Sequence, residues 1–457
     1  MTANVVIAGG GFAGASAARR LERLLPKQSA RLILVNDVNF LLYTPFLPEA
    51  AAGTLEPRHV VTPLRDILDR TYLRLGAVCG HDPEARTVTL RTHEGEHEEL
   101  RYDQFVVALG SVSRSLPIPG LDQHAIGFKS LADAIWLRNH VIDTLEQANA
   151  TEDPARQEEL LTYVFVGGGY SGLEALAELQ DFAADAMDRY PRARLHGMRW
   201  ILVEAMDRVL PEVPPDLADY ALRELRGRGI DVRLGTRLDE ITADSVRLST
   251  GEQIPTRTVV WTAGVAPHPS LSSLGLPLDE RGKVTVDEYM QVEALRGVWA
   301  IGDCAAVPDP AKGGQAPSPP TAQNAVRQGP VVAHNIACEL GVATQPRPFS
   351  YKAKASFVNL GRYKAVGKLG RFSFRGFPAW DGAQLPHEPD PGHGPQDPGG
   401  RGLDRRFAVP TRRRRGRLDR PPAPAARRGV CPRWHAPACR LTVRWEPRPA
   451  RGRGVKG

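Results

Sequence analysis

Cysteine is scarce in this chain, and long apolar runs are absent from it. The 457 residues include five cysteines, which form no C-x-x-C pair and no metal-like group: Cys79, Cys304, Cys338, Cys431 and Cys439. Scattered thiols suit a reducing compartment. No stretch reaches about 18 consecutive apolar residues, and the first residues enter a core-type strand without the charged and apolar regions of a signal peptide. We therefore expect an intracellular protein with no membrane-spanning helix and no bound metal.

Residues 381–457 lack isoleucine and carry the excess positive charge. They hold 17 Arg and 1 Lys against 7 acidic residues, whereas residues 1–380 hold 41 basic and 45 acidic residues. The net charge of +7 and the pI near 9.2 therefore arise from residues 381–457, and the rest of the chain gives no reason to expect a nucleic-acid partner. With 13 Pro and 11 Gly, this segment cannot bury enough apolar surface to offset chain entropy. We expect a disordered C-terminal tail.

The composition changes abruptly after Trp380. With Arg and Leu counted in their commoner C-initial codons, 17 of the 40 residues in 341–380 have codons that begin with A or T, whereas in 381–420 only Phe407 and Thr411 do. A GC-rich gene read one base out of step gives this loss, because third codon positions, which avoid A and T, are then read as first positions. We hypothesise that the tail is a frameshift product; independent gene sequences with an intact frame across this junction would refute the idea.

A glycine-rich turn follows the first predicted strand. The stretch NVVIAGGGFAGASAARRLERLL holds Gly9, Gly11 and Gly14 in G-x-G-x-x-G spacing, between an apolar run and an Ala-rich helical pattern. The first glycine makes the tight turn, the second lets a pyrophosphate approach the backbone, and the third lets strand and helix pack closely. After the second strand, RLILVND, Asn36 takes the usual place of the ribose-binding acid. Asp37 is our candidate substitute.

The same pattern occurs a second time. LTYVFVGGGYSGLEAL holds Gly167, Gly169 and Gly172, and RWILVEAM places Glu204 at the end of a later strand. A carboxylate there can hold both ribose hydroxyls and repel a 2′-phosphate, which favours NAD over NADP. The gap from Gly167 to Glu204 exceeds the usual spacing of about 20 residues, so we expect a helical insertion. Two such turns predict an α/β protein with two Rossmann-like domains and two dinucleotides.

A third segment distinguishes the two sites. GVWAIGDCAAV places Gly302 and Asp303 after a strand that must return to one of the two sheets. Here the chain resembles the two-dinucleotide-binding flavoprotein family, in which such an Asp meets the ribityl or pyrophosphate part of FAD; YDQFVVALGS and TVVWTAGVAPHP resemble its crossover strands. The resemblance implies FAD on the first turn and NAD on the second. It also implies this domain order: FAD domain 1–113 and 281–345, NAD domain 114–280, interface remnant 346–380 and tail 381–457.

Within that family, three stretches resemble type II NADH dehydrogenases, which are single-subunit NADH:quinone oxidoreductases. They are LLYTPFLPEAAAGTLEPRHV, EAMDRVLPEVPPDLADYALRELRGRGIDVRL and PPTAQNAVRQG, and the resemblance extends from residue 4 to about residue 380. It implies hydride transfer from NADH to FAD and transfer of two electrons to a quinone. The motif A-Q-x-A-x-x-Q makes Ala322, Gln323 and Gln328 candidate quinone-binding residues, with Gln323 on the acceptor side of the flavin.

Glu174 follows the second turn by two residues. By resemblance it lies near nicotinamide and flavin, where a carboxylate can tune hydride transfer or relay a proton. Two plainer interpretations stay open: Glu174 as a helix N-terminal acid that satisfies the dipole, and Gln323 as an ordinary helix amide. Cys304 is expected to be a small buried residue, and Trp136 to belong to the apolar stripe of a helix.

Alternatives within the fold differ in their cysteines and acceptors. The stretch FLLYTPFLPEAAAG has no C-x-x-x-x-C, which excludes the disulfide reductases, and Cys304 with Cys338 matches sulfide:quinone reductases poorly. A soluble NADH oxidase, a ferredoxin-type reductase, a non-catalytic NADH-sensing flavoprotein and an inactive relic remain rivals. The expected partners are NADH and quinone, with a homodimer among the assemblies considered. Members of the family lie on the inner, cytoplasmic face of the cell membrane, and the departure after Trp380 predicts that the anchor is lost.

Overall fold

The computed structural model describes residues 2–310, 313–314, 316–351, 355–376 and 379. All of them belong to one compact unit. The predicted disordered tail, residues 381–457, and the hypothesis of its frameshift origin lie outside the described residues. Within the part of the chain that the structure describes, no helix has both the length and the apolar character needed to cross a membrane.

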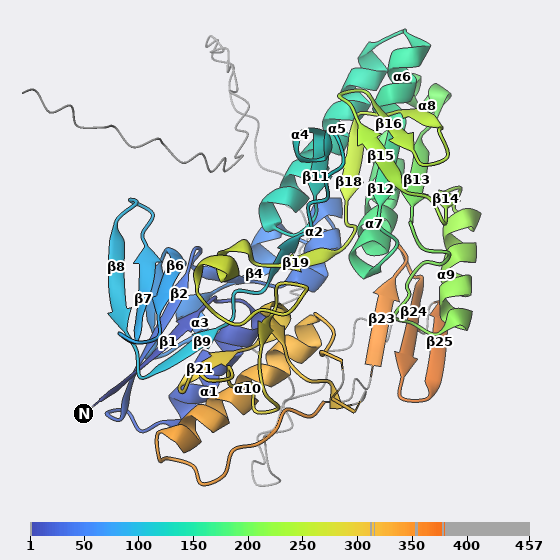
Figure 1. Cartoon of the computed structure of the whole chain (residues 1–457). Coiled ribbons are helices and arrows are strands. Elements are labelled where there is room, and N and C mark those ends of the chain that lie inside the picture. The colour runs from blue at the N-terminus through green and yellow to red at the C-terminus, as the bar shows by residue number, and fades with distance from the viewer. Residues whose placement is uncertain (1, 311–312, 315, 352–354, 377–378, 380–457) are drawn as a thin grey trace, which may run out of the picture. The chain divides into compact units, whose positions relative to one another are not determined.

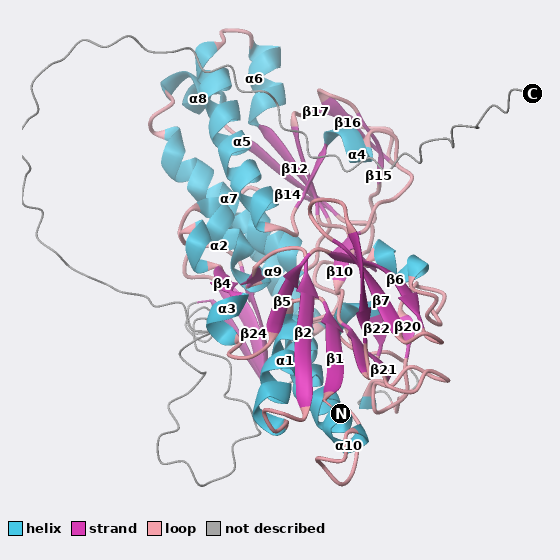
Figure 2. Cartoon of the chain, turned by 90° about the vertical axis from the view of Figure 1, so that its left-hand side faces the viewer, coloured by secondary structure: helices cyan, strands magenta, loops and turns pink. Residues whose placement is uncertain are grey.

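The first sheet is parallel and has the strand order β21-β9-β1-β2-β5. Its strands are β1 (Ala3–Ala8), β2 (Ala30–Asn36), β5 (Tyr72–Leu75), β9 (Gln104–Val107) and β21 (Val298–Ala300). Residues 5–8 and 105–107 are almost completely buried, as expected for the centre of a parallel sheet. Two helices, α1 (Phe12–Leu24) and α10 (Ala322–Glu339), lie side by side against it (Figures 1 and 2).

The second sheet is also parallel, with the order β11-β18-β12-β13-β14. Its strands are β11 (Ala125–Gly127), β12 (Thr162–Val166), β13 (Arg199–Val203), β14 (Asp231–Arg233) and β18 (Thr258–Trp261). Its helices are α5 (Leu131–Ala150), α6 (Pro154–Leu161), α7 (Tyr170–Met187), α8 (Pro191–His196) and α9 (Pro215–Gly227). The long α7 and the added α8 are the expected insertion before Glu204. The two parallel sheets confirm the predicted α/β fold with two Rossmann-like domains.

Smaller elements connect and cover these sheets. The two predicted crossover segments run antiparallel to each other as β10 (Ser111–Ser113) and β19 (Val265–Pro267). The remaining sheets are formed by β3 (Phe40–Leu42) with β4 (Val61–Pro63); β6 (Ala77–Asp82), β7 (Thr87–Arg91) and β8 (His97–Arg101); β15 (Leu238–Ile241), β16 (Ser245–Leu248) and β17 (Gln253–Pro255); β20 (Val284–Thr285) with β22 (Ala305–Ala306); and β23 (Ala355–Asn359), β24 (Ala365–Leu369) and β25 (Phe372–Gly376). Short helical turns are α2 (Leu47–Ala52), α3 (Leu64–Ile67), α4 (Leu121–His124), η1 (Thr44–Phe46), η2 (Pro57–His59), η3 (Pro269–Ser273) and η4 (Gly302–Cys304).

Two features link the chain's distant parts. Strand β21 pairs with β9 although about 190 residues separate them, so the first sheet is completed only after the second has been traversed. Strand β23 packs against α7, and β24 against α9 (Figure 1). Residues near position 359 therefore lie beside the helix that follows the second glycine turn.

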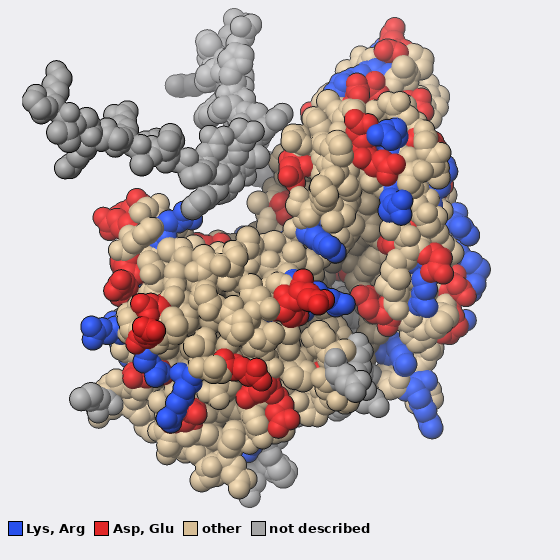
Figure 3. Space-filling model, in the orientation of Figure 1, with Lys and Arg blue, Asp and Glu red and all other residues tan. Residues whose placement is uncertain are grey.

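Surface features agree with the near-neutral charge of residues 1–380. On the face shown in Figure 3, acidic and basic side chains are interspersed. Several form pairs at the surface, such as Arg362 with Asp185 and Lys364 with Glu224.

The expectation that Trp136 belongs to the apolar stripe of its helix is wrong. Trp136 is 53% exposed and stacks on His140, while other residues of α5, including Leu137 and Val141, face the core.

Candidate functional site

The first glycine turn is held by close backbone contacts. Gly9 has φ +105°, and a Cβ there would lie 2.2 Å from the carbonyl oxygen of Ala108. A Cβ on Gly14 would lie 1.9 Å from the oxygen of Gly9, whereas a Cβ on Gly11 would meet no atom within 4 Å. Gly9 and Gly14 are thus required by the fold itself. Gly11 faces open space at the N-terminus of α1, where no side chain caps the helix, so the geometry there suits a phosphate group.

Asn36 and Asp37 differ in their relation to this turn. The Oδ1 atom of Asn36 accepts a hydrogen bond from the N–H of Gly10 at 2.7 Å, and its Nδ2 donates to the oxygen of Val38 at 2.9 Å. Asp37 is exposed, and its backbone oxygen lies 2.9 Å from Nε2 of His93. The residue that supports the turn is therefore Asn36, while Asp37 lies exposed at the end of the strand.

The second turn repeats this geometry. Gly167 has φ +115°, and a Cβ on Gly172 would lie 2.1 Å from the oxygen of Gly167, whereas Gly169 faces open space. The carboxylate of Glu204 accepts the N–H of Gly168 through Oε2 and the N–H of Met206 through Oε1, the latter at 2.8 Å. These bonds fix Glu204 at the edge of the turn, which is where a ribose would meet it.

The Gly302–Asp303 segment is brought to the first turn and not to the second. A Cβ on Gly302 would lie 3.1 Å from Cβ of Ala13, near the start of α1. The carboxylate of Asp303 accepts a hydrogen bond from Ser111 Oγ at 2.7 Å, and Lys129 Nζ donates to the same hydroxyl at 3.2 Å. This placement agrees with the assignment of Asp303 to the ligand of the first turn.

Cys304 follows in the same segment, and it is fully buried. Burial raises the pKa of its thiol to about 11. A thiol of this kind is inert at neutral pH, so the prediction of a small buried residue is confirmed. The three described cysteines, Cys79, Cys304 and Cys338, are all free thiols. Among the described residues no group of three or more His, Cys, Asp or Glu side chains is arranged to hold a metal ion.

The two glutamines of the third motif have different surroundings. Gln328 is 2% exposed, and its Oε1 accepts the N–H of Gly302 at 2.6 Å, so it ties α10 to the Asp303 segment. Gln323 is half-buried; its Nε2 donates to the oxygen of Ala355, and the Tyr351 hydroxyl donates to its Oε1, both at 3.2 Å. Ala322, the first residue of α10, is half-buried.

Glu174 lies in the second turn of α7, and the first turn contains no acidic residue. The alternative of an N-terminal acid that satisfies the helix dipole is therefore wrong. Its Oε1 accepts the backbone N–H of Asn359 at 3.0 Å. Burial, helped by the charges of Glu49 and Glu178, raises the pKa of the Glu174 carboxyl to about 8, although the hydrogen bond from the Asn359 N–H lowers it.

Three residues of this region were missed by sequence reasoning: Glu49, Glu178 and Asn359. Glu178 could have been found, because it lies four residues after Glu174 and such a pair shares one helix face. Glu49 stands out as an acid inside the apolar stretch FLPEAAA. Asn359 gives no local signal, since only the packing of β23 on α7 brings it there.

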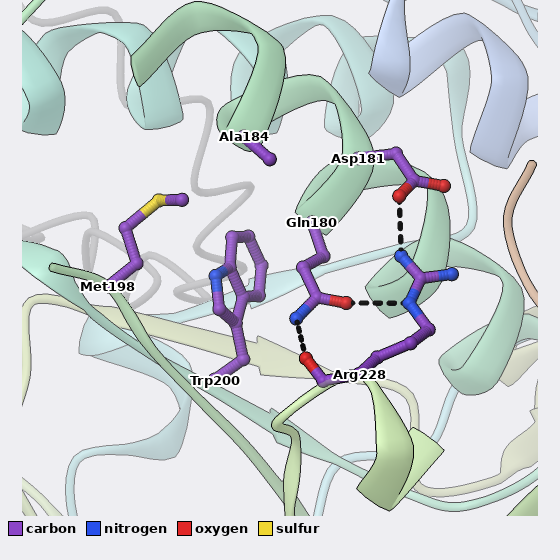
Figure 4. Close-up of a pocket in the computed structure, with 6 residues that line it drawn as sticks. All are labelled: Gln180, Asp181, Ala184, Met198, Trp200 and Arg228. Carbon is purple, nitrogen blue, oxygen red and sulfur yellow. Dashed lines mark hydrogen bonds and ion pairs between the residues drawn. The ribbon is translucent and has the colours of Figure 1, made fainter. Parts of the chain in front are cut away.

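A pocket of about 350 Å³ lies beside the C-terminal half of α7. It is lined by Gln180, Asp181, Ala184, Met198, Trp200 and Arg228 (Figure 4). Its polar side chains bind one another: Arg228 donates to Asp181 at 2.7 Å and to Gln180 at 2.9 Å. None of the sequence-predicted site residues lines it, so this pocket is separate from the two glycine turns.

Comparison with known proteins identifies the family. The model of the pyridine nucleotide-disulphide oxidoreductase family matches residues 3–329. The chain belongs to this family. A "Probable NADH dehydrogenase" of Dictyostelium discoideum is 30% identical over 365 residues, which cover 78% of this chain and 79% of that protein. The "Type II NADH:quinone oxidoreductase Ndh" of Mycobacterium tuberculosis is 29% identical over 82% of this chain and 81% of its own length.

A solved structure agrees with the fold. NDH2 from Plasmodium falciparum, in complex with NADH, has a TM-score of 0.77 at 18% identity and covers 84% of this chain and 94% of its own. Another curated relative is longer, and the chain spans 58% of its length. The predicted resemblance to type II NADH dehydrogenases is confirmed, and the chain is an oxidoreductase of that kind.

Proposed function

We propose that the chain is an FAD-dependent enzyme that takes hydride from NADH and passes two electrons to a quinone. The observation that carries the proposal is the pair of glycine turns with one geometry, only one of which lies beside Asp303. When bound, FAD would supply the electron-carrying chemistry, and the protein would align the donor and the acceptor with it.

FAD would be held at the first turn. The open space over Gly11 and the uncapped N-terminus of α1 fit its pyrophosphate, and Asp303 fits its ribityl region. The proposed residues are Gly9, Gly11, Gly14, Asp37, Gly302 and Asp303. The corresponding FAD domain comprises residues 1–113 and 281–345.

NADH would be held at the second turn, in a domain of residues 114–280. The proposed residues are Gly167, Gly169, Gly172 and Glu204. The fixed Glu204 carboxylate favours NADH, because it would accept hydrogen bonds from the ribose hydroxyls and repel a 2′-phosphate.

The quinone side is assigned to Ala322, Gln323 and Gln328, with Glu174 near the reacting groups. Gln323 is the better candidate for direct contact, since the Gln328 oxygen is already bound to Gly302. The similarity to the NADH:quinone oxidoreductase of M. tuberculosis supports quinone as the acceptor. By the same resemblance, the enzyme would be a cytoplasmic protein that lies on the inner face of the cell membrane only if the anchor expected after Trp380 were intact. Whether it forms a homodimer is to be measured.

An anaerobic titration tests the proposal. The purified protein should be yellow, NADH should bleach the absorbance of oxidised flavin, and a soluble short-chain quinone should restore it. Recovery with oxygen or ferredoxin but not with quinone would favour the oxidase or reductase alternative. A stable complex of NADH with unbleached flavin would favour the sensing alternative, and a colourless protein would contradict FAD binding.

A further inference from the structure

Three carboxylates from two elements meet at one residue. Glu49 belongs to α2, Glu174 and Glu178 belong to α7, and Asn359 ends β23. The backbone N–H of Asn359 donates to Glu174 at 3.0 Å, and its side-chain Nδ2 donates to Glu178 Oε1 at 2.9 Å. The amide of Asn359 also lowers the pKa of Glu49. We call these four residues the Asn359 cluster.

One oxygen of the cluster has no partner. The Oε2 atom of Glu49 is buried and makes no hydrogen bond with any described residue. Leaving a charged oxygen in this state costs several kcal/mol, whereas a protonated carboxyl can donate its own hydrogen to a neighbour. Helix α2 packs on α7, where the charge of Glu178 acts on Glu49. It also packs on α5, whose Arg138 guanidinium carbon would lie 2.9 Å from a Cβ on Gly53 at the end of α2. The geometry therefore favours a shared proton over three separate charges.

Two nearby cations, Arg228 and Arg362, are bound to other groups. Arg228 is bound to Asp181 and Gln180 (Figure 4). It also donates to the backbone oxygens of Ala177 and Leu360. Arg362 pairs with the Asp185 carboxylate.

Other charged and titratable groups face the cluster from the packed elements. Arg138 of α5 lies over the ring of Phe182, 5.9 Å from its centroid. Asp181 raises the pKa of Glu178, and Tyr170 is a half-buried phenol whose own pKa is raised by burial. Arg228 and Arg362 lower the pKa of Glu178, but less than burial raises it. Among the residues that the structure describes, no cation forms an ion pair with Glu49, Glu174 or Glu178.

The proton content of the cluster follows from this arrangement. Burial raises the pKa of Glu174 to about 8 and that of Glu49 to about 7, and it raises the pKa of Glu178 as well. At neutral pH the cluster therefore retains at least one proton.

The reaction proposed above needs one proton. The balance is NADH + H⁺ + quinone → NAD⁺ + quinol: hydride brings two electrons and one hydrogen nucleus, while the quinol gains two hydrogens. We propose that Glu49 and Glu178, held by Asn359, are positioning residues that keep Glu174 protonated, so that the Asn359 cluster gives this second proton to the reduced acceptor and regains it from solvent. This inference rests on the proposed function.

The test separates the two half-reactions. Glu49→Gln removes one charge and keeps the shape of the side chain, so flavin reduction by NADH, which needs no added proton, should be unchanged. The rate of flavin reoxidation by a short-chain quinone should fall as pH rises. In the variant this fall should begin at a pH about one unit or more lower than in the unmodified protein. Glu178→Gln should act in the same direction. The exposed Glu56, which lies near α2 but outside the cluster, supplies the control Glu56→Gln.

A second readout does not depend on turnover. The infrared absorption of protonated carboxyl groups near neutral pH should weaken in Glu49→Gln and stay unchanged in Glu56→Gln. The proposed role of the cluster would be overturned by one result. In it, NADH bleaches all three proteins, and the pH profile of reoxidation and the infrared band are the same in Glu49→Gln, Glu178→Gln and the unmodified protein. Absence of bleaching by NADH in the unmodified protein would instead refute the proposed function.

Discussion

Asn36 occupies in the first glycine turn the position that Glu204 occupies in the second. Each side chain accepts the N–H of the middle residue of its turn, Gly10 and Gly168 respectively. The structural task is the same, but only Glu204 performs it with a negatively charged side chain. The two sites can therefore be distinguished by charge although their backbones are alike.

Glu204→Gln should weaken the preference for NADH over NADPH. The amide oxygen can still accept the N–H of Gly168, but the repulsion of a 2′-phosphate is lost, so the ratio of kcat/KM values should fall by about tenfold. Steady-state kinetics with both nucleotides measures this. Asn36→Asp is the matched control at the other turn and should leave the ratio unchanged; a change there instead would mean that the nucleotides are assigned in reverse.

Gly14→Ala and Gly11→Ala should fail in different ways. A methyl group on Gly14 would collide with the Gly9 oxygen, so we expect a loss of stability of several kcal/mol and poor folding. Gly11→Ala has room in the protein, so the chain should fold, yet the methyl would occupy the place of the pyrophosphate and lower the FAD content. Thermal unfolding and flavin content per chain measure both. Full flavin content in Gly11→Ala would argue against FAD at this turn.

Glu174→Gln should alter the dependence of stability on pH. Because its pKa rises from 4.5 to about 8 on folding, the protonated carboxyl contributes fully below about pH 4.5, and this stability is lost as pH rises through about 8. The variant should therefore lose less stability than the unmodified protein between these values. Urea unfolding at several pH values checks the slope.

Glu224→Gln serves as the control for that slope. Its hydrogen bond with Lys364 lowers the pKa of Glu224, so its contribution is complete above about pH 4.5 and is lost only as pH falls further. The variant should show the same slope as the unmodified protein between about pH 5 and pH 8. A parallel slope for Glu174→Gln as well would show that this carboxyl titrates normally.

Gln328→Leu and Gln323→Leu should separate support from acceptor binding. Gln328→Leu leaves the Gly302 N–H without its partner and should cost about 1–3 kcal/mol of stability. Gln323→Leu should raise the KM for quinone while flavin reduction by NADH keeps its rate. Chemical unfolding of both variants measures the loss of stability, and half-reaction kinetics measure the KM for quinone and the rate of flavin reduction. Equal effects on quinone KM would place both side chains at the acceptor.

The sequence predicted the parts of the fold that local chemistry determines. The spacing of Gly9, Gly11 and Gly14 predicts a strand, a turn and a helix because the turn and the contact of Gly14 with Gly9 lie within a few residues of one another. The return of residues 298–300 to the first sheet was predicted as a return to one of the two sheets, and the motif at Asp303 indicated which. The sequence alone therefore predicts the two Rossmann-like domains.

Long-range packing was not predictable in the same way. Asn359 meets Glu49 across about 310 residues of chain, and neither residue carries a motif that points to the other. Trp136 shows the reverse error, since its apolar character indicated the core, but the buried stripe of α5 runs along another side of the helix. The support given by Asn36 likewise depends on the close approach of its side chain to Gly10.

The pairing of β21 with β9 has a consequence during synthesis. Residues 125–261 form the second sheet within one continuous segment, so that sheet can close early. The first sheet keeps β9 as an open edge until about 190 more residues have been added, which takes roughly 10 to 40 s at about 5–20 residues per second. For that time the nascent chain exposes an unpaired, apolar strand edge of the kind that invites aggregation. The sheet that begins first is therefore completed after the second sheet, and its open strand edge is where a chaperone would be needed.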